Sequence, residues 1–184
     1  MAHQAGRETE DHLLSSPEQV ELPSLAARLQ DVACSLGVSV GTAESCTGGL
    51  IGHSITAVAG SSDYYLGGVI CYADEVKIGS LGVPAAAIER HGAVSAQVVV
   101  AMAEGLRDHI GCDYAVAVTG VAGPGGGSET KPVGLTYVAT AGPTGHQVRR
   151  HTWDGDRAAN KEQSAAAAMQ LLLEVLESSG PDAA

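Results

Sequence analysis

The sequence predicts a single α/β domain of three layers, in which helices cover both faces of a mixed, mostly parallel sheet. Short apolar runs typical of buried strands alternate along the chain with longer segments of helical periodicity. A chain of 184 residues is also long enough to bury one substantial core. We therefore expect residues 23–178 to form the domain, and we expect the polar ends, residues 1–22 and 179–184, to be flexible.

The first half of the chain predicts a helix that ends before Gly37, because glycine commonly follows the last residue of a helix. Ser95 is a typical cap for a later and longer helix. In chain order we expect a helix at residues 24–36, a strand at 38–40, a helix at 50–58, a strand at 68–72 and two further helices at 84–90 and 95–110.

The second half predicts a buried strand at residues 113–118 and, after a loop, two strands near residues 134–140 and 147–153. Residues 142–145 read Gly-Pro-Thr-Gly, a turn signal that joins antiparallel neighbours, so the sheet should be mixed. A final Ala-rich helix over residues 156–176 has the apolar spacing needed to pack on that sheet.

Composition excludes several classes of protein. The formal net charge of −11, without a Lys/Arg cluster, argues against a nucleic-acid partner, because neutralising a phosphate backbone requires a basic surface. No apolar run is long enough to cross a membrane, and no histidine motif indicates a metal. We expect a small-molecule ligand, no metal or other cofactor, and a homodimer, since oligomers are common among small α/β proteins. No secretory signal and no zinc spacing accompany the four cysteines, so we expect a cytoplasmic location: Cys34, Cys46, Cys71 and Cys112.

The most informative stretch is Thr-Ala-Glu-Ser-Cys-Thr-Gly-Gly at residues 42–49. It lies between a predicted strand and a predicted helix, so Ser45 should sit at a helix N-terminus, where free N–H groups favour negative charge. Such a turn can present a nucleophile, hold a phosphate or stabilise an oxyanion. Ser45 as a simple helix cap explains the pattern equally well, and Cys46 is either another candidate nucleophile or a buried thiol. Glu44 either orients a base or satisfies backbone donors.

A serine nucleophile needs a base, and no histidine and acid pair is well placed to serve. Lys77, held neutral by burial, is the leading candidate, with Tyr72 able to relay a proton or orient the serine. The alternative is that Lys77 is a solvated surface residue and Tyr72 a half-buried strand residue. Ser45, the loop at residues 72–77 and the loop at residues 119–128 each follow a predicted strand, so adjacent strands would bring them together.

The glycine-rich loop at residues 120–127 lets backbone amides approach a phosphate closely, although it lacks the P-loop and dinucleotide motifs. Lys131 can supply a counter-charge, and Arg157, beside the helix cap Asp156, can reach an anion. An ordinary surface loop, an exposed lysine and an Asp–Arg ion pair are the alternative interpretations.

Several motifs resemble one family, the CinA C-terminal domain, whose stand-alone members are nicotinamide-nucleotide amidases. The resemblance covers residues 24–177, and it rests on independent motifs in the right order, which makes it specific. The motifs are AESCTGG at 43–49, GSS with an aspartate at 60–63, Y-x-D-x-x-K at 72–77, GAVS at 92–95, MA at 102–103, TGVAGPGGGSETKPVG at 119–134 and GDR at 155–157.

The resemblance implies hydrolysis of the carboxamide of nicotinamide mononucleotide, which gives nicotinic acid mononucleotide and ammonia without a metal or organic cofactor. It implies that Ser45 attacks the carboxamide carbon while Lys77 and Tyr72 move protons to the departing ammonia. Thr119 would hydrogen-bond the serine or the substrate. The backbone amides of Cys46, Thr47 and Gly48 would hold the oxyanion, and the nucleotide would be bound by Gly123, Gly125, Gly126, Gly127, Lys131 and Arg157.

Two positions depart from the family pattern. Asp74 stands where the family has asparagine, and an ionised carboxylate beside Lys77 favours the charged lysine and opposes its use as a base. A family arginine is replaced in the region of Asn160 and Lys161, and a lysine keeps the charge but loses the bidentate fork. We therefore expect weaker phosphate binding.

Two other functions fit the same residues. The first is a non-catalytic nucleotide-binding or interaction module connected with competence or DNA-damage responses. The second is a cysteine-based amidase, which predicts that Cys46→Ala abolishes turnover while Ser45→Ala leaves it intact.

Overall fold

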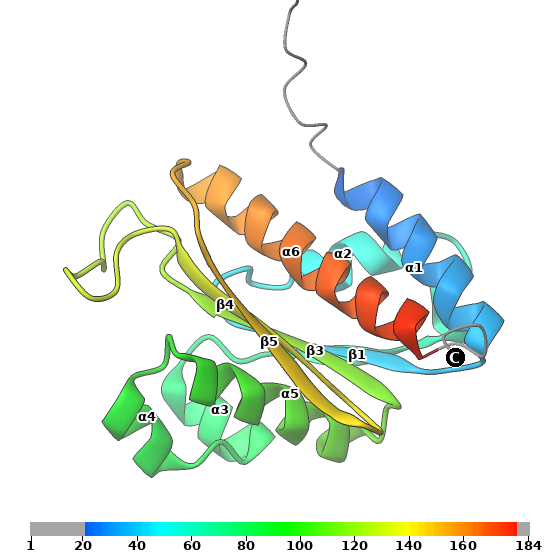
Figure 1. Cartoon of the computed structure of the whole chain (residues 1–184), viewed down its shortest axis with the longest axis horizontal. Coiled ribbons are helices and arrows are strands. Elements are labelled where there is room, and N and C mark those ends of the chain that lie inside the picture. Colours follow the sequence, from blue (N-terminus) through cyan, green and yellow to red (C-terminus); the bar gives the residue numbers. More distant parts are fainter. Residues whose placement is uncertain (1–20, 180–184) are drawn as a thin grey trace, which may run out of the picture.

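The structure, a computed structural model, describes residues 21–179 (Figure 1). Within these residues the chain forms one five-stranded sheet with helices on both faces. The strands are β1 (Val40–Glu44), β2 (Tyr65–Ile70), β3 (Tyr114–Gly120), β4 (Leu135–Gly142) and β5 (Gly145–Thr152). The helices are α1 (Leu22–Leu36), α2 (Leu50–Thr56), α3 (Asp74–Leu81), α4 (Ala85–His91), α5 (Ala96–Ile110) and α6 (Arg157–Ser178), with a 3-10 turn, η1, at Ser61–Asp63.

The order of the strands in the sheet is β2-β1-β3-β4-β5. β1 pairs in parallel with β2 and with β3, whereas β4 is antiparallel to both of its neighbours. Four of the five strands therefore run in one direction, and only β4 is reversed. The carboxyl ends of β2, β1 and β3 consequently meet at the same end of the sheet, where open α/β folds form their ligand sites.

The two faces of the sheet carry separate apolar cores. Helices α1, α2 and α6 cover one face, and helices α3, α4 and α5 cover the other (Figure 1). Leu29 and Leu172 are buried in the first core, and Met102 and Leu106 in the second. Since the chain contains no phenylalanine, aliphatic side chains and alanines fill most of both cores.

Helix α5 packs unusually close to the end of α3. A Cβ atom at Gly105 would overlap the carbonyl group of Leu81, so only glycine allows this approach of the two backbones. Leu81 and Lys77, one helical turn apart, are the buried residues of α3. The contact between α5 and α3 therefore helps to fix the position of Lys77.

The predicted fold class is confirmed, and so are several local signals. The side chains of Ser95 and Asp156 each accept a hydrogen bond from a backbone N–H in the first turn of the helix that follows. Gly142 pairs with Gly145 at the end of β4 and β5, as the turn signal predicts. Most of residues 1–22 and 179–184, expected to be flexible, lie outside the described residues, and no helix in the described part is long and apolar enough to cross a membrane.

Two local expectations are wrong. Residues 74–81 form α3 rather than a loop, although acidic residues in the first turn and Gly82 after the last residue are ordinary helix signals. Ser45 does not sit at the start of a helix, because α2 begins only at Leu50 and Gly49 is its cap residue. The helix-cap interpretation of Ser45 is therefore excluded.

We expect Asp113, at the amino-terminal end of the sheet, to contribute to stability in a pH-dependent way. The backbone N–H and the hydroxyl of Ser39 both donate to its carboxylate, at 2.8 and 2.7 Å, and they hold the pKa of Asp113 below its usual value of 3.8. Because the folded state favours the ionised form, the contribution is complete above the unfolded pKa and is lost as the pH falls through the lower folded value. Thermal unfolding followed by circular dichroism should show a smaller loss of Tm on acidification, from about pH 6 to about pH 3, for Asp113→Asn than for the wild type. Equal losses would contradict this role.

Candidate active site

Ser45 lies directly after β1, between the ends of its two parallel neighbours. Its backbone N–H donates to the carbonyl of Val118 in β3 at 3.1 Å. On the other side, the N–H of Cys71, just past β2, donates to the carbonyl of Glu44 at 2.8 Å. These bonds continue the parallel ladder beyond β1 and place Ser45 at the carboxyl end of the three strands.

The alternation of side chains assigns Ser45 to the face covered by α3 and α5. Ala43 belongs to the apolar core on that face, whereas the carboxylate of Glu44 bonds to α2 on the opposite face. The next residue, Ser45, returns to the face of Ala43. In β3, Thr119 follows Ala117 on the same face, and the register that pairs Ala43 with Ala117 brings Thr119 beside Ser45. The Thr119 hydroxyl donates to the carbonyl of Ala93 at 3.0 Å.

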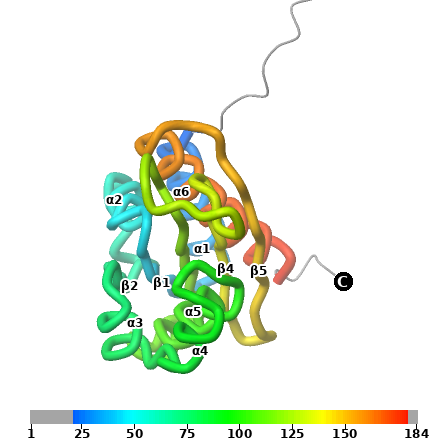
Figure 2. Tube along the Cα trace, turned by 90° about the vertical axis from the view of Figure 1, so that its left-hand side faces the viewer, coloured from blue at the N-terminus to red at the C-terminus, as the bar shows by residue number. Residues whose placement is uncertain are grey.

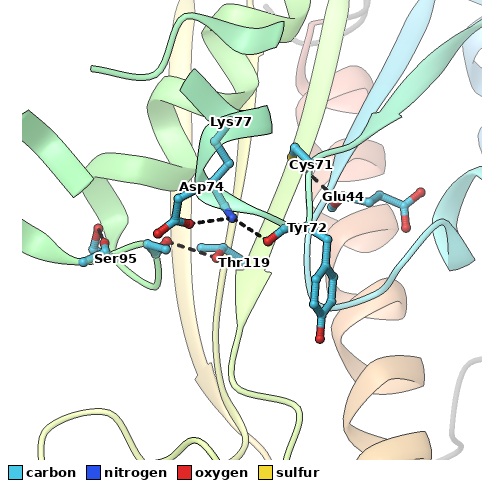
Figure 3. Close-up of polar contacts among 9 residues, drawn as sticks. Glu44, Cys71, Tyr72, Asp74, Lys77, Ser95 and Thr119 are labelled. Carbon is cyan, nitrogen blue, oxygen red and sulfur yellow. Dashed lines mark hydrogen bonds and ion pairs between the residues drawn. The ribbon is translucent and has the colours of Figure 1, made fainter. Parts of the chain in front are cut away.

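Lys77 approaches this face from α3. Only 1% of the residue is exposed, which excludes a solvated surface lysine. Its Nζ donates to the carbonyl of Tyr72 at 3.0 Å and to Oδ1 of Asp74 at 3.1 Å (Figure 3). Since an ammonium group has three N–H donors, these two bonds leave one donor for a further partner. The carboxylate predicted to oppose a basic role of Lys77 is thus in direct contact with it.

The side chain of Tyr72 points away from Lys77 (Figure 3). The residue is 60% exposed, and its hydroxyl accepts a hydrogen bond from Nη2 of Arg157 at 3.3 Å. Nη1 of Arg157 donates to the carbonyl of Gly123 at 2.7 Å. The structure therefore groups Tyr72 with Arg157 and Gly123, and it does not bring the phenol to Lys77.

Residues 46–48 form the turn after Ser45. The N–H of Gly48 is used within the turn, since it donates to the carbonyl of Ser45 at 3.1 Å. Within the described part of the chain, the N–H groups of Cys46 and Thr47 have no oxygen partner. Burial raises the pKa of the Cys46 thiol to about 12. Cys46 is therefore a protonated, buried thiol near neutral pH rather than a nucleophile. Its backbone N–H and that of Thr47 can together donate to an oxyanion.

Lys161 reaches the same turn from α6. Its Nζ lies 3.9 Å from the position that a Cβ atom would take at Gly48. Arg157 and Lys161 are one helical turn apart, so both cations lie on one side of α6. The sequence indicates this region through the replaced family arginine. The approach of Lys161 to residues 45–48, the serine turn, depends on how α6 packs, which the sequence does not show.

The glycine-rich loop lies at the same end of the molecule as the start of α6 (Figure 1, Figure 2). Gly125, Gly126 and Gly127 are exposed, whereas Gly123 is buried. Asn160 donates to the carbonyl of Ala122 at 3.1 Å and so fastens the loop to α6. The loop is also fastened at its far end, because Nζ of Lys131 donates to the carbonyl of His91 at 2.6 Å. Lys131 therefore connects the end of the loop to the last residue of α4.

The family model of the CinA C-terminal domain matches residues 23–176. The chain belongs to this family. A CinA-like protein of Synechococcus sp. RCC307 is 54% identical over 73% of this chain, and one of Salinibacter ruber is 49% identical over 80%. The aligned regions are 32% and 36% of those two proteins, so the chain spans about a third of the length of these curated relatives.

Solved structures of the CinA superfamily share the fold. The competence/damage inducible protein CihA from Agrobacterium tumefaciens has a TM-score of 0.81 at 39% identity, covering 88% of this chain and 99% of that one. The competence damage-inducible protein A from Klebsiella pneumoniae MGH 78578 has a TM-score of 0.84 at 31% identity, covering 87% and 99%. The fold of this CinA-family domain is thus shared over nearly the whole length of both neighbours.

We expect the native CinA-family domain to be alkylated at Cys34 alone when it is treated with iodoacetamide at about pH 8. Cys34 is exposed, whereas burial raises the pKa of Cys46 to about 12 and of Cys71 and Cys112 to about 11 each. Peptide mass spectrometry of the labelled protein measures the pattern, and labelling after denaturation is the control. Rapid labelling of Cys46 in the native protein would restore the cysteine-based interpretation.

Proposed function

We propose that this domain hydrolyses the carboxamide of nicotinamide mononucleotide to nicotinic acid mononucleotide and ammonia. The observation that carries the proposal is the burial of Lys77 on the same face of the sheet as Ser45 and Thr119. A buried lysine on the same face of the sheet as a serine that ends a parallel strand fits the arrangement of a base and a nucleophile. The family resemblance supports the choice of substrate.

In the proposed reaction, the Oγ of Ser45 attacks the carboxamide carbon and its proton passes to the neutral amine of Lys77. The oxyanion receives hydrogen bonds from the N–H groups of Cys46 and Thr47, which have no oxygen partner within the described residues. The intermediate then collapses, the C–N bond breaks, and Lys77 returns the proton to the departing ammonia. Water hydrolyses the acyl-serine ester and regenerates Ser45.

The nucleotide end of the substrate is assigned to the start of α6. Lys161 places a positive charge beside Gly48, and Arg157, one helical turn away on α6, places a second beside Gly123, on a chain whose net charge is −11. Tyr72, bonded to Arg157 and largely exposed, supplies an aromatic ring and a hydroxyl at the same place. We assign Tyr72 to substrate binding rather than to proton transfer.

The first test is ammonia release from nicotinamide mononucleotide by the purified wild type, Ser45→Ala and Cys46→Ala. We expect release by the wild type, a loss of at least about 1,000-fold in Ser45→Ala, and turnover by Cys46→Ala, which keeps its backbone N–H. Turnover by Ser45→Ala together with loss in Cys46→Ala would favour the cysteine-based amidase. Nucleotide binding without ammonia release by the wild type would favour the binding module.

The ion pair between Asp74 and Lys77 predicts the effect of removing the carboxylate. Asp74 lies 3.1 Å from Nζ of Lys77 and favours the ammonium form, which cannot accept the serine proton. Asp74→Asn should therefore raise kcat/KM for ammonia release at neutral pH. The control is Glu75→Gln, which removes an exposed carboxylate of the same helix turn and should leave kcat/KM unchanged. An unchanged or lower kcat/KM in Asp74→Asn would contradict the role of Lys77 as the base.

A further inference from the structure

Glu44 is a buried carboxylate that the proposed reaction does not use. Only 2% of the residue is exposed, and in the described part of the chain it forms no ion pair with a lysine, arginine or histidine. Four donors reach its two oxygens: the hydroxyl of Thr47 at 2.7 Å and the backbone N–H groups of Gly49, Ile51 and Gly52 at 3.0, 3.0 and 2.8 Å. Hydrogen bonds of this kind are charge-assisted, and they offset the cost of burying the charge.

These four bonds close the turn that carries Ser45. Glu44 precedes the serine, Thr47 follows it by two residues, and their side chains are joined across it. Inside this loop, the N–H of Gly48 donates to the carbonyl of Ser45. The backbone on both sides of Ser45 is thus tied to one carboxylate on the opposite face of the sheet from the reacting atoms.

The same bonds divide the N–H groups of the segment into two sets. The N–H groups of Gly49, Ile51 and Gly52 are taken by Glu44, so these three donors cannot bind a substrate anion. The N–H groups of Cys46 and Thr47 have no oxygen partner within the described residues, and the Cys46 sulfur lies beside them. An anion that develops on the substrate is therefore offered the donors of the turn beside Ser45 rather than the three donors that Glu44 takes.

We infer that Glu44 is a positioning residue: its carboxylate holds the turn so that Ser45 and the N–H groups of Cys46 and Thr47 face the same substrate carbon. The inference rests on the proposed serine chemistry and extends it to a residue that touches neither substrate nor reacting atoms. Its alternative is a purely structural role, in which Glu44 stabilises the fold and changes catalysis only through the amount of folded protein.

The test is Glu44→Gln, which keeps the shape of the side chain but replaces one acceptor oxygen by an NH₂ group. This NH₂ group cannot accept hydrogen bonds from the donors that face it. Misplacement of the turn should lower kcat by roughly 10- to 100-fold, whereas KM should change by less than about threefold, because the nucleotide contacts lie on α6. Both constants are measured well below the Tm of each variant. A rise in KM with unchanged kcat would overturn the inference.

The matched control is Asp113→Asn, which also removes a carboxylate that accepts a backbone and a hydroxyl hydrogen bond, at the opposite end of the same strands. It should lower Tm and leave kcat unchanged. If Glu44→Gln lowers kcat no more than Asp113→Asn does, the role of Glu44 is structural and the inference fails. If Glu44→Gln does not fold, Thr47→Val removes the bond across Ser45 alone and should still lower kcat by roughly 10-fold with KM unchanged; an unchanged kcat would overturn the inference.

A second readout separates this inference from the proposed function. The rate at which a fluorophosphonate probe modifies Ser45, measured by mass spectrometry, reports the reactivity of the serine without the nucleotide. If the wild type is modified but releases no ammonia from nicotinamide mononucleotide, the proposed substrate is wrong, and slower modification of Glu44→Gln still supports the inference. Equal modification of both proteins, or none of the wild type, would overturn it.

Discussion

The alternation of side chains along β1 determines what the end of this strand can do. All five residues of β1 are buried, and parallel neighbours on both sides fix its register against two separate cores. A shift of one residue would exchange the faces of Glu44 and Ser45 and bury the wrong side chains throughout the strand. The packing of the whole domain thereby keeps the carboxylate with α2 and the hydroxyl with α3 and α5, although the two residues are adjacent.

Electrostatics at the site differ from those of the whole chain. The net charge of −11 repels anions, but under physiological conditions salt largely screens interactions between charges more than about 8 Å apart. Within that distance of the serine turn, the local charges count more, and Lys161 lies beside Gly48 while Arg157 lies one turn away on α6. The contact of Lys77 with Asp74 leaves less positive charge on the other face of the sheet. If the proposed substrate is right, these charges favour its phosphate on the α6 side.

The fold could be predicted from the sequence because its signals are local and repeated. Apolar periodicity indicated the strands and long helices, and the caps at Ser95 and Asp156 marked helix starts that the structure contains. The short helix α3 was missed, since eight residues around one buried lysine give little periodicity. Residue patterns at strand ends were sufficient to single out Ser45 and Lys77, and the family resemblance added Thr119; all three lie on one face of the sheet.

Other parts of the site depend on tertiary structure that local patterns do not contain. The direction of Tyr72 depends on where β2 ends, because each further residue reverses the face. The four bonds of Glu44 depend on α2 beginning at Leu50, which leaves a turn for the carboxylate to close. Lys161 reaches the serine turn only because α6 packs against the sheet. Its spacing from Arg157 indicates that both residues lie on one side of the helix, but it does not indicate which part of the fold that side faces.

Gly105 shows how a residue remote from the chemistry constrains what the domain can vary. The backbones of α5 and α3 touch at this point, so no side chain of any size can be accepted there without moving α3 outward. Such a movement would withdraw Lys77 from the strand ends and admit water around its amine. Substitutions on the exposed surface of α3 are compatible with the present site. The distance between α3 and α5, in contrast, cannot be changed in small steps by substitutions at Gly105.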